Sequence, residues 1–278
     1  MSSKITKDTI DKYLSEVAKE YRRHGGKALP AEIVIIGGAS VLINYGFRNM
    51  TVDIDAIIHA SSAMKDAITK IGDKYSLPYG WLNDDFSNTS SFSDKILQYS
   101  KYYKTFSNVL TVRTVSDKYL LAMKLVSARP YKKDQSDIVG IVKEIKASGG
   151  TITVEDVKQA AIQLYGTTNA VREDGWEFLN AVIAFGDYEA LYNTISAREA
   201  SVKTELIRIA EDYPSAITRN NFKDVVKTVD RKEQGINDLI ISIENQPLKK
   251  LDDKIAAAKK AQEQNTNINT PHNGDLQL

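Results

Sequence analysis

Two aspartates and a glycine turn are the residues of this chain whose types and spacing most clearly suggest chemistry. The β-branched run that ends at Ile36 is closed by Gly37-Gly38, and Asp53 and Asp55 follow. Glycines at a strand-to-helix turn let the backbone approach a ligand closely and point its N–H groups at an anion. Ser40 adds a hydroxyl donor in the first turn of the expected helix. The turn therefore predicts a phosphate contact.

The spacing of Asp53 and Asp55 predicts a metal site. Residues i and i+2 of a strand point to the same face, so the two carboxylates should project together. Two ionised carboxylates repel each other, and a divalent ion removes that cost. Mg2+ prefers carboxylate oxygens together with substrate phosphate and water. Alone, a Gly-Gly turn is common and Asp-x-Asp often marks the solvent face of an edge strand, but the ordered combination is far more specific.

A second group of charged residues lies on two later helices. Lys124 shares an apolar helical stripe with Leu121, and Asp134 and Asp137 each precede by four residues an isoleucine on the face expected to be buried. Charged residues on core-facing stripes usually need a partner, and one arrangement pairs Lys124 with an aspartate beside the metal pair. In the alternative, Lys124 extends to solvent and both aspartates favour a helix N-terminus.

Apolar periodicity predicts the elements that must position these residues. The resulting fold class is α/β (α+β), a small mixed sheet flanked by helices and followed by a mainly helical C-terminal region. Ser148-Gly149-Gly150 is the expected boundary, which gives domains at 1–150 and 151–262 and a disordered Asn/Gln-rich tail at 263–278. Strands are expected at 32–36, 51–58 and 109–115, and helices at 5–24, 39–45, 62–75, 116–129, 134–146, 153–165, 174–185, 187–211, 220–244 and 248–263.

Composition narrows the class of protein. The 278 residues include no cysteine, which excludes disulfides, zinc-thiolate sites and thiol nucleophiles. No apolar run approaches the roughly 18 residues of a membrane span, and a cytoplasmic protein is expected. Residues 1–150 hold 22 Lys+Arg against 16 Asp+Glu, and residues 151–278 hold 15 against 20. The basic half suits a nucleotide or RNA, although chance also explains so small an excess.

Tyrosines and lysines alternate around residues 99–104. Tyr99, Tyr102 and Tyr103 stand among Lys101 and Lys104. Mixed aromatic and basic side chains could engage RNA, and a solvated helix face explains them equally well.

The stretch Ile35-Ile36-Gly37-Gly38-Ala39-Ser40, followed by Arg48, Thr51, Asp53 and Asp55, resembles the signature of the polymerase-β-like nucleotidyltransferase superfamily. It is most similar to the bacterial branch that contains abortive-infection toxins of the AbiEii type and related nucleotidyltransferase-like families of unknown function. Lys118 to Leu125, Arg129, Lys133-Asp134 and Asp137 resemble that branch's downstream helices. The resemblance covers roughly residues 30–165.

The resemblance implies a role for each of these residues. Asp53 and Asp55 would hold Mg2+, while Gly37, Gly38, Ser40, Arg48 and Lys124 would contact the phosphates of an NTP. Fully active members carry a third carboxylate on a later strand, and the strand at 109–115 has none. Either Asp134 or Asp137 supplies it or acts as general base, or the site is catalytically reduced.

The implied function is Mg-dependent transfer of a nucleotidyl group from an NTP to a hydroxyl of an RNA (such as tRNA), a protein or a small molecule. The closest branch suggests the toxin of a toxin–antitoxin or phage-defence system, with an antitoxin protein as partner. The alternative is a catalytically reduced protein of the same fold that binds a nucleotide or a partner.

Overall fold

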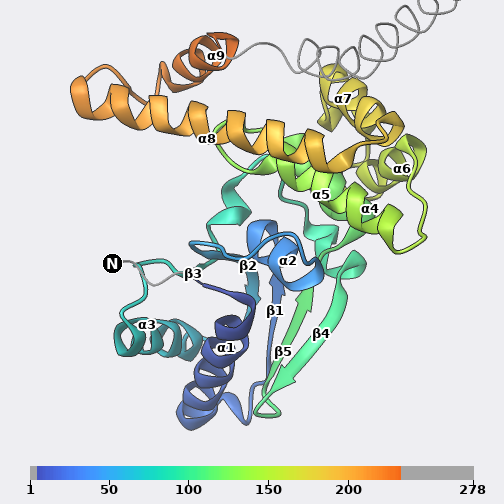
Figure 1. The fold of residues 1–278 in the computed structure, drawn as a ribbon. Coiled ribbons are helices and arrows are strands. Elements are labelled where there is room, and N and C mark those ends of the chain that lie inside the picture. The colour runs from blue at the N-terminus through green and yellow to red at the C-terminus, as the bar shows by residue number, and fades with distance from the viewer. Residues whose placement is uncertain (1–4, 233–278) are drawn as a thin grey trace, which may run out of the picture. The chain divides into compact units, whose positions relative to one another are not determined.

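A strand, a glycine turn, a helix and a second strand form the centre of the fold (Figure 1). The computed structural model describes residues 5–232. The helices of this part of the chain are α1 (Lys7–Tyr21), α2 (Gly37–Asn44), α3 (Ala63–Tyr75), α4 (Asp117–Ser127), α5 (Asp134–Ala147), α6 (Val154–Tyr165), α7 (Glu173–Ala184), α8 (Tyr188–Asp212) and α9 (Phe222–Lys232). Its strands are β1 (Ala31–Ile35), β2 (Ile54–His59), β3 (Leu82–Asn83), β4 (Lys101–Phe106) and β5 (Leu110–Thr114).

The strands form one mixed sheet in the order β3-β2-β1-β5-β4. The central strand β1 is antiparallel to β2 and parallel to β5, with Ile35 opposite both Ala56 and Thr114. The end of β1, the start of β2 and the end of β5 therefore meet at one edge of the sheet. The predicted fold class, a mixed sheet flanked by helices with a helical C-terminal region, is confirmed.

Helices α1 and α3 share a hydrophobic core with the sheet. Ile10, Leu14 and Val17 of α1 are fully buried in one cluster with Ile33 and Ile35 of β1. These α1 residues lie on one face of the helix, because their spacing follows the helical repeat. The core holds the sheet rigid below the edge at which β1 ends.

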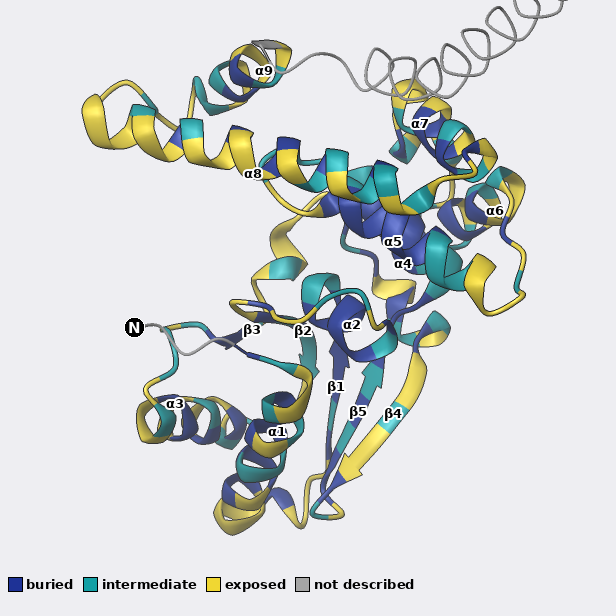
Figure 2. Ribbon diagram, in the orientation of Figure 1, coloured by how far each residue is buried: buried dark blue, intermediate teal, exposed yellow. Residues whose placement is uncertain are grey.

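Helices α4 to α8 lie beyond that edge of the sheet (Figure 1). Helix α4 packs against α5 and α6, and α5 packs against α8, so α4 and α5 are the most deeply buried of the group (Figure 2). Residues on both sides of the expected boundary at 148–150 thus contact one another. No helix within residues 5–232 is long and apolar enough to cross a membrane. The helix expected at 248–263 and the tail at 263–278 lie outside the described residues.

Two strands, the short β3 and the longer β4, were not expected from the sequence. The segment Lys101–Phe106 is the edge strand β4, antiparallel to β5, so the interpretation as a solvated helix face is wrong. Its side chains are largely exposed on both faces (Figure 2), which hides the hydrophobic alternation that normally identifies a strand. Lys101 and Lys104 form ion pairs with Asp117 and Asp11, so both lysines already have carboxylate partners.

Candidate functional site

The glycine turn and Asp55 lie side by side at the edge of the sheet where β1 ends. The N–H of Ile36 donates to the carbonyl oxygen of Asp55 at 3.0 Å. Gly37 has a φ of +57°, and a Cβ there would lie only 3.2 Å from Oδ2 of Asp55. Both the backbone conformation and the close carboxylate require glycine at this position. Local geometry thus brings the predicted phosphate turn against the predicted metal ligand.

The two carboxylates of the acidic pair influence each other. Asp55 is the second residue of β2 and is half-buried, whereas Asp53 lies before the strand, not within it as expected, and is exposed. Burial raises the pKa of Asp55, the charge of Asp53 raises it further, and a hydrogen bond from Asn83 opposes both effects. Within residues 5–232 neither carboxylate belongs to an ion pair. Two carboxylates that influence each other and have no ion-pair partner fit a divalent cation such as Mg2+.

A cavity of about 300 Å³ is lined by Gly37 of the glycine turn and by Asp55 of the acidic pair. This volume is at the lower end of the range of small-molecule sites. A larger cavity of about 660 Å³, between α3 and residues 77–85, borders the first one at Asp85. The smaller cavity is the candidate site, because it alone of the two is lined by Gly37, Asp55 and the cations Lys124 and Arg129. Its lining includes Gly37, Asp55, Asp85, Thr89, Ser91, Lys124, Ser127, Arg129 and Asp134.

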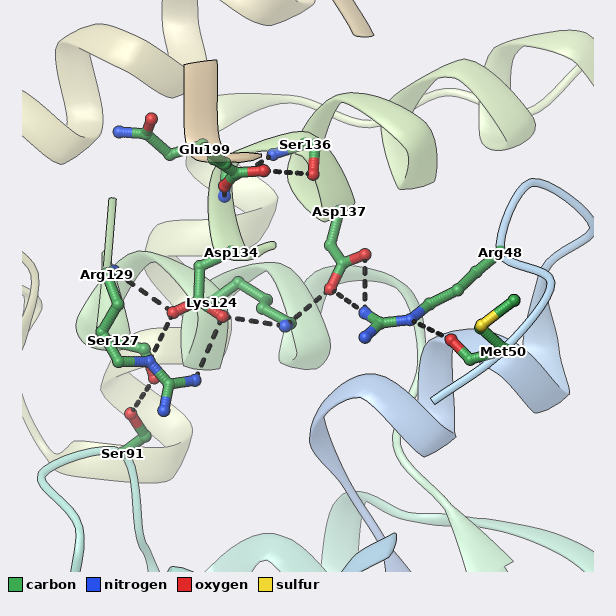
Figure 3. Close-up of polar contacts among 11 residues, drawn as sticks. Arg48, Met50, Ser91, Lys124, Ser127, Arg129, Asp134, Ser136, Asp137 and Glu199 are labelled. Carbon is green, nitrogen blue, oxygen red and sulfur yellow. Dashed lines mark hydrogen bonds and ion pairs between the residues drawn. The ribbon is translucent and has the colours of Figure 1, made fainter. Parts of the chain in front are cut away.

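An ion-pair network forms one side of the site (Figure 3). Nζ of Lys124 lies 2.9 Å from Oδ1 of Asp134 and 2.7 Å from Oδ2 of Asp137. Nε of Arg129 lies 2.8 Å from Oδ2 of Asp134, and Nη1 of Arg48 lies 2.6 Å from Oδ2 of Asp137. The chain is therefore Arg129–Asp134–Lys124–Asp137–Arg48. With three cations and two carboxylates it carries one excess positive charge beside the acidic pair.

Burial and pairing fix the charge states in this network. Burial opposes the charge on Lys124, but Asp134 and Asp137 hold the pKa of Lys124 above its ordinary value. Burial would raise the pKa of Asp134, yet Lys124 and Arg129 lower it to about 2. Lys124 accordingly does not extend to solvent, because its side chain is 7% exposed and paired on both sides.

The structure does not place Asp134 or Asp137 as a third metal ligand. Their side chains are 1% and 2% exposed and contact cations. In the part of the chain that the structure describes, no group of three or more Asp, Glu, His or Cys residues is placed to hold a metal ion. Asp134, held ionised by two cations, is also a weak proton acceptor. In this arrangement both aspartates instead orient Lys124, Arg129 and Arg48.

Arg48 lies directly against the glycine turn. A Cβ at Gly38 would meet Nη2 of Arg48 at 2.7 Å, so a larger residue there would displace the guanidinium. Nε of Arg48 donates to the carbonyl oxygen of Met50 at 3.3 Å, and Nη1 donates to Asp137 (Figure 3). Arg48 therefore connects α5 to the turn and places its positive charge next to Gly38.

Ser40 has a different role from the one expected. Its hydroxyl is fully buried, donates to the carbonyl oxygen of Val115 and accepts from the N–H of Val115 at 3.1 Å. These bonds tie α2 to the end of β5. The expected phosphate contact by this hydroxyl is therefore wrong for the present arrangement, because its donor is already used within the core. The partner lies 75 residues away, so the local sequence could not reveal it.

Two cations of the site were not singled out from the sequence as ligand contacts. Arg129 and Lys132 both attract the charge of Asp55 and so reach toward the acidic pair. They lie in the segment between α4 and α5, where Ala128 adopts a left-handed conformation with φ of +37° and redirects the chain. The signal in the sequence was the clustering of Arg129, Lys132 and Lys133 directly after Lys124.

Comparison with family models agrees with this geometry. Residues 12–193 match the family described as "Nucleotidyltransferase of unknown function (DUF6036)". Comparisons with curated proteins and with solved structures give no significant match. The matched segment includes the glycine turn, the acidic pair and the whole ion-pair network. Because it also spans more than half of the chain, the protein belongs to this family of nucleotidyltransferases of unknown function.

Proposed function

We propose that this protein is a Mg-dependent nucleotidyltransferase that uses an NTP as donor and the hydroxyl of another molecule as acceptor. The observation that carries the proposal is the closeness of Gly37 to Asp55, whose pKa the charge of Asp53 raises, in a cavity also lined by Lys124 and Arg129. Family membership supports nucleotidyl transfer in general. The metal, the donor and the acceptor are our inference from the chemistry of the residues.

The residues around the cavity suit an in-line phosphoryl reaction. Asp53 and Asp55 would hold Mg2+, which polarises the attacked phosphate and neutralises charge on the departing pyrophosphate. The backbone of Gly37 and Gly38 would approach the triphosphate. Lys124, which lines the cavity, would keep a fixed positive charge there. Such catalysis depends on positioning and on electrostatic stabilisation more than on covalent chemistry.

The segment between α4 and α5 would complete the triphosphate contacts. Arg129 is 42% exposed at its side chain and lines the cavity, so it retains donors for a ligand while it pairs with Asp134. Lys132 is exposed, and its charge attracts Asp55. Cations on this segment would neutralise the triphosphate from the side opposite the metal.

RNA such as tRNA, protein and small molecules remain the acceptor classes under this proposal. The finer proposal, a toxin of the AbiEii type with an antitoxin protein as partner, depends on the resemblance of the two motif regions. The toxin role would be excluded if the protein transfers nucleotides in a Mg-dependent reaction and no antitoxin protein suppresses that activity.

A second candidate is a protein that binds a nucleotide without transferring it. The observation in its favour is that Asp134 and Asp137 are neutralised by cations, which leaves two carboxylates rather than three at the candidate metal site. NTP binding that requires Mg2+ but releases no pyrophosphate with any acceptor would establish this alternative.

A labelling experiment tests the proposed reaction. The protein is incubated with Mg2+, each labelled NTP in turn, and total cellular RNA, cell protein or a panel of small molecules. We expect the label to enter one of these fractions and to fall about 1,000-fold or more in Asp53→Ala, because loss of a metal ligand removes several kcal/mol of charge stabilisation. Asp66→Asn, an exposed change in the first turn of α3, is the matched control. Labelling that survives Asp53→Ala unchanged would overturn the assignment.

A further inference from the structure

Glu199 of α8 lies outside the segment matched by the family model, and its carboxyl group reaches the start of α5. Glu199 is 4% exposed, and its Oε1 accepts from the N–H groups of Gln135 at 2.9 Å and Ser136 at 3.4 Å. Its Oε2 accepts from the hydroxyl of Ser136 at 2.5 Å (Figure 3). The first N–H groups of a helix have no partner within the helix. Glu199 therefore supplies a cap to α5 from another helix.

Helix α5 lacks a cap of its own. Its N-cap residue is Lys133, whose side chain makes no capping hydrogen bond. Ser, Thr, Asp and Asn are the residues that normally fill this role, since a short side-chain oxygen accepts from the first turn. Without Glu199 the N–H groups of Gln135 and Ser136 would lose the acceptor that the structure gives them. The order of the first turn of α5 thus depends on α8.

The same turn carries the acidic residues of the ion-pair network. Gln135 and Ser136 face Glu199, while Asp134 and Asp137, one residue to either side, face Lys124, Arg129 and Arg48 (Figure 3). Any shift of this turn moves both aspartates, and Asp134 and Asp137 are the groups that orient the buried Lys124. The cap is therefore mechanically connected to the cations at the cavity.

The position of Glu199 is electrostatically costly. Burial raises its pKa to about 8, hydrogen bonds from Ser136 and Gln135 oppose the rise, and the charge of Asp137 adds to it. Its neighbour Arg198 pairs with Asp230 of α9 at 2.5 Å, so adjacent residues of α8 connect α9 and α5. With this pKa the carboxyl group of Glu199 is largely protonated at neutral pH, and its two oxygens still accept from three donors of the first turn. A buried carboxyl group placed in this way indicates a specific positional role.

We propose that Glu199 is a positioning residue for the candidate site: by capping α5 from α8, it fixes Asp134 and Asp137 and, through them, Lys124 and Arg48 beside the glycine turn. The part of this inference that concerns nucleotide affinity rests on the proposed function. The part that concerns the order of α5 and the placement of Lys124 does not.

Three variants of the full chain test the proposal. Glu199→Leu removes the acceptor and keeps side-chain bulk, whereas Glu199→Gln keeps one carbonyl oxygen for the N–H groups. The matched control is Glu189→Gln, which removes a surface ion pair between α8 and Lys143 of α5 and leaves the cap intact. The readouts are amide hydrogen exchange at residues 135–138, chemical labelling of the Lys124 amine, the Kd for Mg-ATP, and kcat and KM separately.

We expect Glu199→Leu to accelerate exchange at residues 135–138 and labelling of Lys124 at least tenfold. We also expect it to raise the Kd for Mg-ATP at least tenfold, with a larger effect on KM than on kcat. Glu199→Gln should stay within threefold of the wild type by each measure, and Glu189→Gln should match the wild type. If Glu199→Leu does not fold, Ser136→Ala, which removes one of the three donors, decides by the same readouts.

Two outcomes are distinguishable. A wild-type protein that neither binds Mg-ATP nor transfers a nucleotide contradicts the proposed function, while exchange and Lys124 labelling still decide the positional role. A folded Glu199→Leu protein with wild-type exchange at 135–138 and an equally protected Lys124 overturns the inference. So does a Glu189→Gln protein that changes as much as Glu199→Leu.

Discussion

Replacing Asp55 with asparagine should abolish nucleotidyl transfer and at the same time raise the stability of the protein. Burial and the neighbouring charge of Asp53 raise the pKa of Asp55 in the folded state. A carboxyl group with a raised folded-state pKa makes unfolding easier as pH rises above its unfolded pKa, because the folded state disfavours the ionised form. At neutral pH the ionised Asp55 therefore destabilises the fold, and a neutral amide of similar shape removes that effect.

The expected magnitudes separate function from stability. Activity should fall about 1,000-fold, equivalent to about 4 kcal/mol of lost transition-state stabilisation. The free energy of unfolding at pH 7 should rise by on the order of 1 kcal/mol, or roughly 2–4 °C in Tm for a protein of this size. The stability gain should shrink as pH falls toward the ordinary aspartate pKa. Urea unfolding at several pH values, with Asp66→Asn as control, measures this. An Asp55→Asn protein that is less stable than the wild type would contradict the conclusion that Asp55 has no ion-pair partner.

Replacing Lys124 with methionine should cause the largest loss of stability of any single change in the site. Lys124 is 7% exposed and is shared by two aspartates that are 1% and 2% exposed. Methionine fills the space but leaves part of each buried negative charge uncompensated. Breaking a buried pair from one side costs about 3–5 kcal/mol. Lys143→Met, which removes the surface pair with Glu189, should cost at most about 1 kcal/mol.

A double variant tests whether charge is the cause. Lys124→Met combined with Asp134→Asn leaves Asp137 paired with Arg48, while the half-exposed Arg129 can turn to solvent. The double variant should be more stable than Lys124→Met alone, because it no longer buries an excess negative charge. Equilibrium unfolding of both proteins decides the point. Strictly additive losses would show that Lys124 stabilises the fold by packing and not by neutralising the aspartates.

The centre of the fold was predictable because its determinants are local. A β-branched run closed by Gly37-Gly38, followed by a short helix and a second strand, specifies the strand–turn–helix–strand unit within about 30 residues. The pairing of Lys124 with a later aspartate was one of two arrangements open from the helical pattern. The structure selects it because the helices carrying both residues, α4 and α5, are packed between α6, α8 and the sheet edge.

The remaining features depend on contacts between distant residues. The hydroxyl of Ser40 finds Val115 only after β1 and β5 have paired, and Glu199 reaches Ser136 across 63 residues. The strand β4 lacks a buried face, so its sequence shows no alternation of apolar and polar residues. The approach of Arg129 and Lys132 to Asp55 follows the left-handed bend at Ala128, and alanine is not a residue type that predicts this conformation.

The charged residues around the cavity form an arrangement that can be tested. Asp55 borders Gly37 and forms no ion pair within residues 5–232, and a network with one excess positive charge borders the same cavity. An NTP with its metal ion would complement both, with the metal at the acids and the phosphates at the cations. Under the proposed function, the site would therefore bind a metal–triphosphate complex more tightly than either component alone.

The most direct test is a crystal structure of the protein with Mn2+ and a non-hydrolysable NTP, with anomalous scattering used to locate the metal. We expect the manganese ion between the carboxylates of Asp53 and Asp55, and the triphosphate oxygens against the backbone of Gly37 and Gly38. A manganese ion held elsewhere, or a triphosphate bound away from the glycine turn, would contradict it.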